Sequence, residues 1–147
     1  MTQEDKQLLL KDLCARLPYG VMIKDTYSGH YGRLVEVGNT FAYFISELNS
    51  NTLDVQLCHV KPYLRPMSSM TEEDIKEFRK NSDFEEREAY EVRANGENKI
   101  VILQADCDLS VKELDWLNEH HFDYRNLIEK GLALEAPPEM YEMNNNV

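Results

Sequence analysis

The hydrophobic pattern of the chain changes at a connector, residues 60–71, that contains two prolines. Before it the apolar residues alternate as in β-strands, and after it helix-start signals dominate. Pro62 and Pro66 each lack a backbone N–H and bias the preceding residue away from the helical region. We therefore predict an extended connector that neither continues the interior of a sheet nor starts a helix, with Tyr63 and Leu64 buried in a core.

Composition places the chain among globular proteins. The 147 residues are 42% hydrophobic and 29% charged, which is enough apolar content for one domain. No apolar run reaches the roughly 20 residues that span a bilayer, and the first residues are acidic rather than basic and apolar as in a secretion signal. We expect a cytoplasmic protein without membrane association. Cys14, Cys58 and Cys107 lie far apart, which predicts reduced, mostly buried thiols.

The formal net charge of -11 is placed unevenly. Residues 1–66 hold 7 Lys/Arg and 7 Asp/Glu, whereas residues 67–147 hold 9 and 20. An acidic surface repels phosphate backbones, and no run of Lys/Arg compensates for it, so we expect no nucleic-acid partner. The acidic second part is expected to serve solubility.

The first 57 residues predict one helix followed by short strands. Thr2 is a suitable N-cap, apolar residues recur at helical spacing, and Pro18 and Gly20 end the segment. The apolar face of this helix is expected to comprise Leu9, Leu10, Leu13, Cys14 and Leu17. Segments 21–23, 33–37, 41–45 and 53–57 then alternate with a period of two and are separated by turn residues, which predicts an antiparallel meander.

We therefore predict an α+β fold: a small antiparallel sheet or SH3-like open barrel, with an N-terminal helix and C-terminal helices packed on it. A two-layer sheet with the first helix across one face is the competing packing. Residues 1–142 are expected to form a single domain, with the helix and meander in residues 1–66 and a helical part in residues 67–142. Residues 143–147 are expected to be a disordered tail.

Three helix starts after the connector share one pattern of a cap residue, a polar residue three positions later, and flanking apolar residues. These patterns predict helices that begin at Glu72, Val111 and Tyr124, the last running to Lys130 with Gly131 as a left-handed cap. The cap pairs are Thr71 with Asp74, Ser110 with Glu113, and Asp123 with Asn126. The apolar pairs are Met70 with Ile75, Leu109 with Leu114, and Phe122 with Leu127.

Between these helices, residues 85–104 predict an inserted hairpin. Two segments rich in strand-forming residues flank the dipeptide Asn95-Gly96, which favours a tight turn. Residues 100–103 are a continuous apolar run, so we expect that strand to be buried on both faces.

The residues with chemical potential do not assemble into a recognised motif. His120 and His121 are adjacent on a predicted helix and point about 100° apart, which does not suit a shared metal ligand set. Cys58 and His59 are strand neighbours that face opposite sides, and no glycine-rich phosphate loop is present. We therefore expect no catalytic residue, no metal and no cofactor, and the sequence favours a non-enzymatic protein over an enzyme.

Three motifs resemble an uncharacterised family of small proteins from gut Bacteroides-type bacteria, their phages and mobile elements. They are KDLCARLPYGV (residues 11–21), KPYLRPMSSMTEE (residues 61–73) and the segment from DWLN to EA (residues 115–136). Residues 83–108 resemble an insertion that shorter members lack. The resemblance implies a phage or mobile-element context and supplies no catalytic residue.

Aromatic residues of the meander are the remaining candidates for function. Tyr27, Tyr31 and Tyr43 are predicted to form a binding surface for a protein partner, as aromatics do in SH3-like recognition modules. The sequence favours a non-enzymatic protein-binding module of phage or mobile-element origin. An acidic phage-encoded inhibitor of a host or defence protein and an unrecognised enzyme remain as alternatives, and the oligomeric state stays open.

Overall fold

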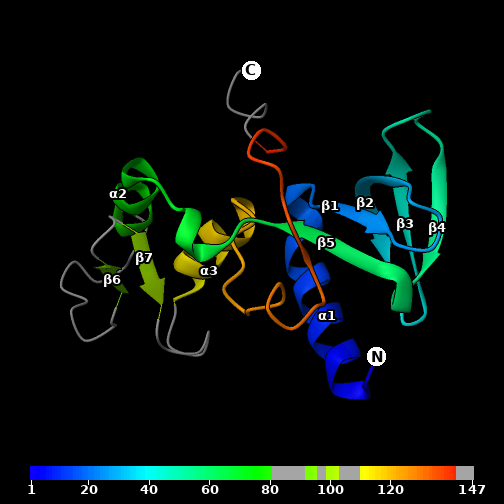
Figure 1. Ribbon diagram of the computed structural model, residues 1–147, viewed down its shortest axis with the longest axis horizontal. Helices are drawn as coiled ribbons and strands as arrows, with labels where there is room; N and C mark the ends of the chain where they lie inside the picture. The colour runs from blue at the N-terminus through cyan, green and yellow to red at the C-terminus, as the bar shows by residue number, and fades with distance from the viewer. Residues whose placement is uncertain (81–91, 96–98, 103–109, 142–147) are drawn as a thin grey trace. The chain divides into compact units, whose positions relative to one another are not determined.

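A computed structural model describes residues 1–80, 92–95, 99–102 and 110–141 (Figure 1). For residues 92–95 and 99–102 it describes the backbone alone. The residues group into two units. Unit 1 comprises Met1–Leu64 and Leu127–Ala136, and unit 2 comprises Arg65–Asn126 and Pro137–Val147.

Unit 1 begins with the predicted helix, α1 (Gln3–Arg16). The Thr2 hydroxyl accepts a hydrogen bond of 3.0 Å from the Asp5 amide and so caps the first turn. A short 3-10 turn, η1 (Leu17–Tyr19), and Gly20 in the left-handed conformation follow the helix.

The buried stripe of α1 differs from the predicted one at Cys14. Cys14 is exposed, and the buried positions recur at i, i+3, i+4 and i+7. This spacing defines one helix face, on which Cys14 does not lie. The buried residues of the stripe are Leu9, Asp12, Leu13 and Arg16. Asp12 and Arg16 form an ion pair of 2.9 Å with both side chains fully buried, which the sequence pattern did not predict.

The strands of unit 1 form a curled, half-barrel sheet in the order β4-β3-β2-β1-β5-β8. The predicted meander is confirmed, because β1 to β4 pair in antiparallel fashion (Figure 1). The strand β8, which pairs with β5 in parallel, comes from a later part of the chain. The strands are β1 (Met22–Asp25), β2 (Tyr31–Val37), β3 (Phe41–Ser46), β4 (Thr52–Gln56), β5 (Val60–Leu64) and β8 (Leu134–Glu135). The α+β small open-barrel class predicted from the sequence is confirmed.

The inner face of this sheet carries the core of unit 1. Alternate residues of each strand point inward, and they share one apolar cluster with α1 and with the returning segment 127–136. The fully buried members are Leu9, Leu13, Val21, Ile23, Ala42, Phe44, Leu64 and Leu127.

The proline connector behaves differently from the prediction, because its first half is an interior strand of the sheet. β5 pairs with β1 on one side and with β8 on the other. Pro62 lies opposite Ile23, whereas β8 reaches only Tyr63 and Leu64, so Pro62 has a strand neighbour on one side alone. A missing N–H is tolerated at such an edge-like position. Strand alternation buries Leu64 completely, as predicted, but leaves Tyr63 half-buried on the outer face.

Unit 2 contains α2 (Glu72–Lys80), α3 (Val111–Glu119) and the hairpin β6 (Val92–Asn95) with β7 (Lys99–Ile102). Both predicted capping boxes are confirmed. The Asp74 and Thr71 side chains each accept a hydrogen bond from the other residue's amide, at 3.0 and 3.1 Å. Ser110 and Glu113 repeat the arrangement at 3.2 and 2.9 Å.

An aromatic cluster fills the core of unit 2. Trp116 contacts Phe78 edge-on, with ring centroids 5.4 Å apart, and stacks on Phe122 at 5.7 Å. The guanidinium of Arg65 lies 4.1 Å from the centroid of the Phe122 ring and donates to the Asp74 carboxylate at 3.2 Å. The other buried members are Met70, Ile75 and Leu117.

The predicted helix over residues 124–130 is wrong, because the segment forms a series of turns. Asn126 has φ 60, and a left-handed residue in the middle of the segment interrupts helical hydrogen bonding. The Asp123 amide donates to the carbonyl of Arg65 at 2.8 Å. Gly131 is left-handed with φ 77, as predicted.

The hairpin prediction is confirmed for its two strands, which pair from Val92 with Ile102 to Asn95 with Lys99. The turn at residues 96–98, the segment 81–91 and Leu109 lie outside the described residues. The expected burial of residues 100–103 and the expected tail at residues 143–147 fall outside them as well.

Candidate binding face of the sheet

The outer face of the unit 1 sheet is where the structure places the predicted tyrosines. Because side chains alternate along a strand, residues next to the buried inner positions point outward. Ile23, Leu34 and Phe44 are buried, so their neighbours on β1, β2 and β3 lie on the outer face. The outer residues include Lys24, Tyr31, Arg33, Tyr43, Asp54, Lys61 and Tyr63.

Tyr31 and Tyr63 form an aromatic pair on this face. Their ring centroids lie 6.4 Å apart with an interplanar angle of 77°, and Tyr31 is 38% exposed. Such an edge-to-face pair is a favourable arrangement of two aromatic rings. Desolvation by burial and the neighbouring Tyr31 both raise the pKa of Tyr63 above its usual range. The Tyr63 hydroxyl therefore keeps its proton at neutral pH and remains a hydrogen-bond donor.

Two lysines flank this aromatic pair. Lys24 on β1 lies in register with Tyr31 on β2 and with Lys61 on β5. Two like charges directly opposite each other on neighbouring strands destabilise a sheet. Among the described residues no carboxylate pairs with either lysine. We call Lys24, Tyr31, Lys61 and Tyr63 the basic–aromatic patch.

Tyr27 lies at the end of the same strands, in the turn between β1 and β2. It is 82% exposed, and its ring stacks on His59 with centroids 5.2 Å apart. The buried carboxylate of Asp25 shapes this turn by accepting from the Tyr27 amide at 2.9 Å and from the Ser28 hydroxyl at 2.8 Å. The Thr26 amide donates to the His59 carbonyl at 2.9 Å and ties the turn to the segment before β5.

Tyr43 lies on the same face but in a different environment. It is 40% exposed and stands in register between Glu36 on β2 and Asp54 on β4. No ring contact within the described part of the chain joins Tyr27, Tyr31 and Tyr43 to one another. Tyr31 therefore belongs to the basic–aromatic patch, Tyr27 to the turn at the end of its strand, and Tyr43 to an acidic part of the same face.

Sequence reasoning missed three members of the basic–aromatic patch: Lys24, Lys61 and Tyr63. It looked for runs of Lys/Arg, whereas strand pairing brings together two lysines from distant parts of the chain. Tyr63 was predicted in the core together with Leu64, because the prolines on either side of the pair fix its direction. The available signal was alternation within residues 60–64, which places Lys61 and Tyr63 on the face opposite Leu64.

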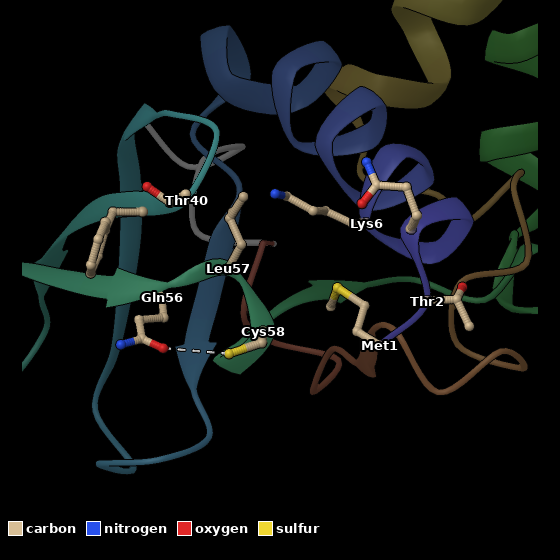
Figure 2. A pocket seen from close by; sticks show the side chains of 9 residues that line it. Met1, Thr2, Lys6, Thr40, Gln56, Leu57 and Cys58 are labelled. Atoms are coloured by element: carbon tan, nitrogen blue, oxygen red, sulfur yellow. Dashed lines mark hydrogen bonds between the residues drawn. The ribbon is translucent and has the colours of Figure 1, made fainter.

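A shallow pocket of about 370 Å³ lies elsewhere in unit 1, between the start of α1 and the end of β4. Figure 2 shows Met1, Thr2 and Lys6 on the helix side and Leu57 and Cys58 on the strand side. The Cys58 thiol donates to the Gln56 side-chain oxygen at 3.6 Å. The remaining lining residues are Gln3, Thr40, Phe41 and Gln56.

Cys58 and Cys14 are both free and exposed, which corrects the expectation of buried thiols. Cys58 lies in the 3-10 turn η2 (Leu57–His59), where the strand alternation that buries Val55 has ended. Cys107 lies outside the described residues. The ring of His59 stacks on Tyr27, and this contact does not suit a nucleophile–base pair with the thiol of its sequence neighbour Cys58.

The two adjacent histidines of unit 2 have separate ring contacts. His120 stacks on Trp116 at 4.2 Å, and its Nδ1 lies 2.9 Å from the Trp116 carbonyl oxygen. His121 is buried and stacks on Tyr141 at 3.9 Å. Over residues 1–80 and 110–141, no three His, Cys, Asp or Glu side chains come close enough together to hold a metal ion.

No protein-family model matches this sequence, and neither a curated protein nor a solved structure shows significant similarity to it. In the portion that the structure describes, none of the helices has the length and apolar character needed to cross a bilayer.

Proposed function

We propose that this chain is a non-enzymatic protein-binding module whose basic–aromatic patch takes up an acidic segment of a partner protein. The observation that carries the proposal is the register of Lys24 with Lys61 beside the Tyr31–Tyr63 pair. A partner carboxylate placed between the two ammonium groups relieves their mutual repulsion and gains two charge-assisted hydrogen bonds.

The tyrosines contribute contact area to such a complex. Tyrosine offers a large, rigid ring with a polar end and loses little conformational entropy on binding. Tyr27 extends the apolar contact beyond the end of the strands, since most of its ring is exposed. Tyrosines of this kind, when they lie near the centre of an interface, often contribute most of the binding energy.

A protein partner is favoured over a nucleic acid by the charge of the chain. With a net charge of -11 the molecule repels a phosphate backbone at long range, whereas a short acidic segment needs to meet only the local positive field. Exposed charges beyond about 8 to 10 Å are screened at physiological salt, so the local lysines dominate the final approach.

The test is affinity capture from a lysate of the native host, followed by mass spectrometry and by binding kinetics with the captured protein. The double variant Lys24→Glu with Lys61→Glu and the single variant Tyr31→Ala are each expected to weaken binding of that protein at least tenfold. The double variant Lys76→Glu with Lys80→Glu, at exposed positions of α2, is the matched charge control and is expected to leave the affinity unchanged.

Equal capture by the wild type and the lysine double variant contradicts the proposal. If the wild type binds a labelled single-stranded oligonucleotide tightly and the same double variant does not, the partner is a nucleic acid and the proposal of a protein partner is wrong. Circular dichroism of each variant verifies that the fold is retained, because both lysines lie on the outer face and are not core residues.

A further inference from the structure

β4 is a free edge of the unit 1 sheet. Within the described residues it stands at the end of the strand order and pairs only with β3. The strand at the other end of the sheet is β8, which has only two residues, so β4 is the longer and more regular edge. Exposed edge strands of this length are natural sites for pairing with another extended chain.

The direction of each backbone group of β4 follows from its pairing. The Leu57 amide donates to the carbonyl of Thr40, and the Ser46 amide donates to the carbonyl of Asn51. Between these two hydrogen bonds the register of β3 with β4 is regular. In an antiparallel pair the hydrogen-bonded residues alternate with non-bonded ones. Leu53 and Val55 therefore bond to β3, whereas the N–H and C=O groups of Thr52, Asp54 and Gln56 point to the open side.

These outward backbone groups have no partner within the described residues. No hydrogen bond among residues 1–80 and 110–141 reaches the main chain of Thr52, Asp54 or Gln56, and all three residues are exposed. Their side chains lie on the outer face, beside the row formed by Glu36, Tyr43 and Asp54. The edge therefore offers three positions for main-chain pairing next to an exposed aromatic ring and two carboxylates.

The charge of this row indicates what can pair with the edge. A second copy of β4 aligned antiparallel about Asp54 places one Asp54 directly opposite the other, and like charges at that position destabilise the pair. A strand with Lys or Arg at that position forms an opposite-charge pair instead. Its aliphatic stem can also lie along Asp54 towards the face of Tyr43, where a cation is favoured.

We propose that β4 is a strand-addition site that accepts an extended segment of a partner protein carrying Lys or Arg opposite Asp54. Main-chain hydrogen bonds to Thr52, Asp54 and Gln56 supply affinity, and the basic residue fixes the register. This surface is separate from the basic–aromatic patch, from which it differs in strand, in charge and in the partner chemistry it selects.

The test uses three capped synthetic peptides and the full chain. The probe is Val-Thr-Val-Lys-Val-Thr-Val, in which Lys and Thr face outward and Val faces inward beside Leu53 and Val55. One control replaces Lys by Glu, and the other is N-methylated at alternate residues on the side that would meet β4. Binding is followed by NMR, through chemical shifts and through hydrogen exchange of the Asp54 and Gln56 amides.

The Lys peptide is expected to slow exchange of both amides and to bind about fivefold tighter than the Glu peptide, whereas the N-methylated peptide leaves the amides unprotected. Asp54→Lys is expected to reverse the preference between the Lys and Glu peptides. Lys24→Glu with Lys61→Glu is expected to leave peptide binding unchanged, which separates this site from the basic–aromatic patch.

Unprotected Asp54 and Gln56 amides at millimolar Lys peptide overturn the proposal, and so does an unchanged peptide preference in Asp54→Lys. Protection of the same amides that grows with protein concentration in the absence of peptide assigns the edge to a second copy of the chain, and this also overturns it. Asp54 is exposed, so its substitution is not expected to prevent folding.

Discussion

Gly32 of β2 lies so close to Ile45 of β3 that a Cβ atom on Gly32 would stand 1.8 Å from the carbonyl oxygen of Ile45. Gly32 is in register with Ile23 on one side and Ser46 on the other, so the approach occurs in the middle of the sheet. Glycine within a strand commonly marks a position where two backbones approach closely or a sheet bends.

Gly32→Ala is expected to reduce the free energy of unfolding by about 3 kcal/mol or more, because backbone rather than a flexible side chain must move. Gly29→Ala is the matched control. Gly29 has φ 85 and no atom within 4 Å of an added Cβ, so only backbone strain of about 1 to 2 kcal/mol is expected. Urea denaturation of both variants measures the difference, and equal losses would show that the contact with Ile45 is unimportant.

Leu64→Ala is expected to cost about 2 to 5 kcal/mol, since the side chain is fully buried in the core of unit 1 and its removal leaves a cavity. Leu48→Ala, at a position that is 75% exposed, is expected to change stability by less than about 0.5 kcal/mol. Thermal unfolding followed by circular dichroism compares the two. A midpoint for Leu64→Ala within error of the wild type contradicts the assignment.

Asp74→Ala is expected to be more destabilising than Thr71→Ala. Removal of Thr71 costs one cap hydrogen bond, about 1 kcal/mol, whereas removal of Asp74 loses the reciprocal cap bond and also the ion pair with Arg65. That pair is partly exposed, so it adds at most about 1 kcal/mol. Denaturant midpoints of both variants and of Glu73→Ala, an exposed control, test the order.

The pH dependence of Tyr63 has a defined sign. Its pKa is raised in the folded state, so the unfolded chain ionises first as the pH rises. The contribution of Tyr63 to the free energy of unfolding is therefore complete below the ordinary tyrosine pKa of about 10, and it is lost as the pH rises above that value. NMR titration is expected to show Tyr63 ionising above the ordinary pKa of a tyrosine. Tyr31→Phe is expected to lower the pKa of Tyr63, and an unchanged titration would show that Tyr31 has no electrostatic influence.

Local sequence patterns predicted the elements that depend on neighbours in the chain. The alternation of residues 21–57 gave the meander, and the cap residues Thr2, Thr71 and Ser110 located three helix starts. The same cap pattern at Asp123 was misleading, because the Asp123 amide donates to the carbonyl of Arg65 and the segment after it contains left-handed Asn126. A cap motif indicates where a helix can begin, but tertiary hydrogen bonds decide whether it does.

Features that depend on distant pairing were not predicted. Leu134–Glu135 is too short for periodicity to reveal a strand, yet it makes β5 an interior strand. The candidate site has the same origin, since the pairing of Lys24 with Lys61 requires the register of β1 and β5. Tyr27, Tyr31 and Tyr43 remain the predicted binding residues, and the different surroundings of Tyr31 and Tyr43 depend on cross-strand neighbours that the sequence alone does not reveal.

The discontinuous composition of unit 1 has a consequence during synthesis. Leu127, Leu132 and Ala133 complete its core, and they leave the ribosome only after all of residues 65–126. Until then the emerging chain carries β5 without β8, with its outer edge unpaired and part of the core uncovered. The half-barrel therefore reaches its final state only after residues 127–136 have been synthesised, and until then the nascent chain presents an additional unpaired strand edge at Tyr63 and Leu64.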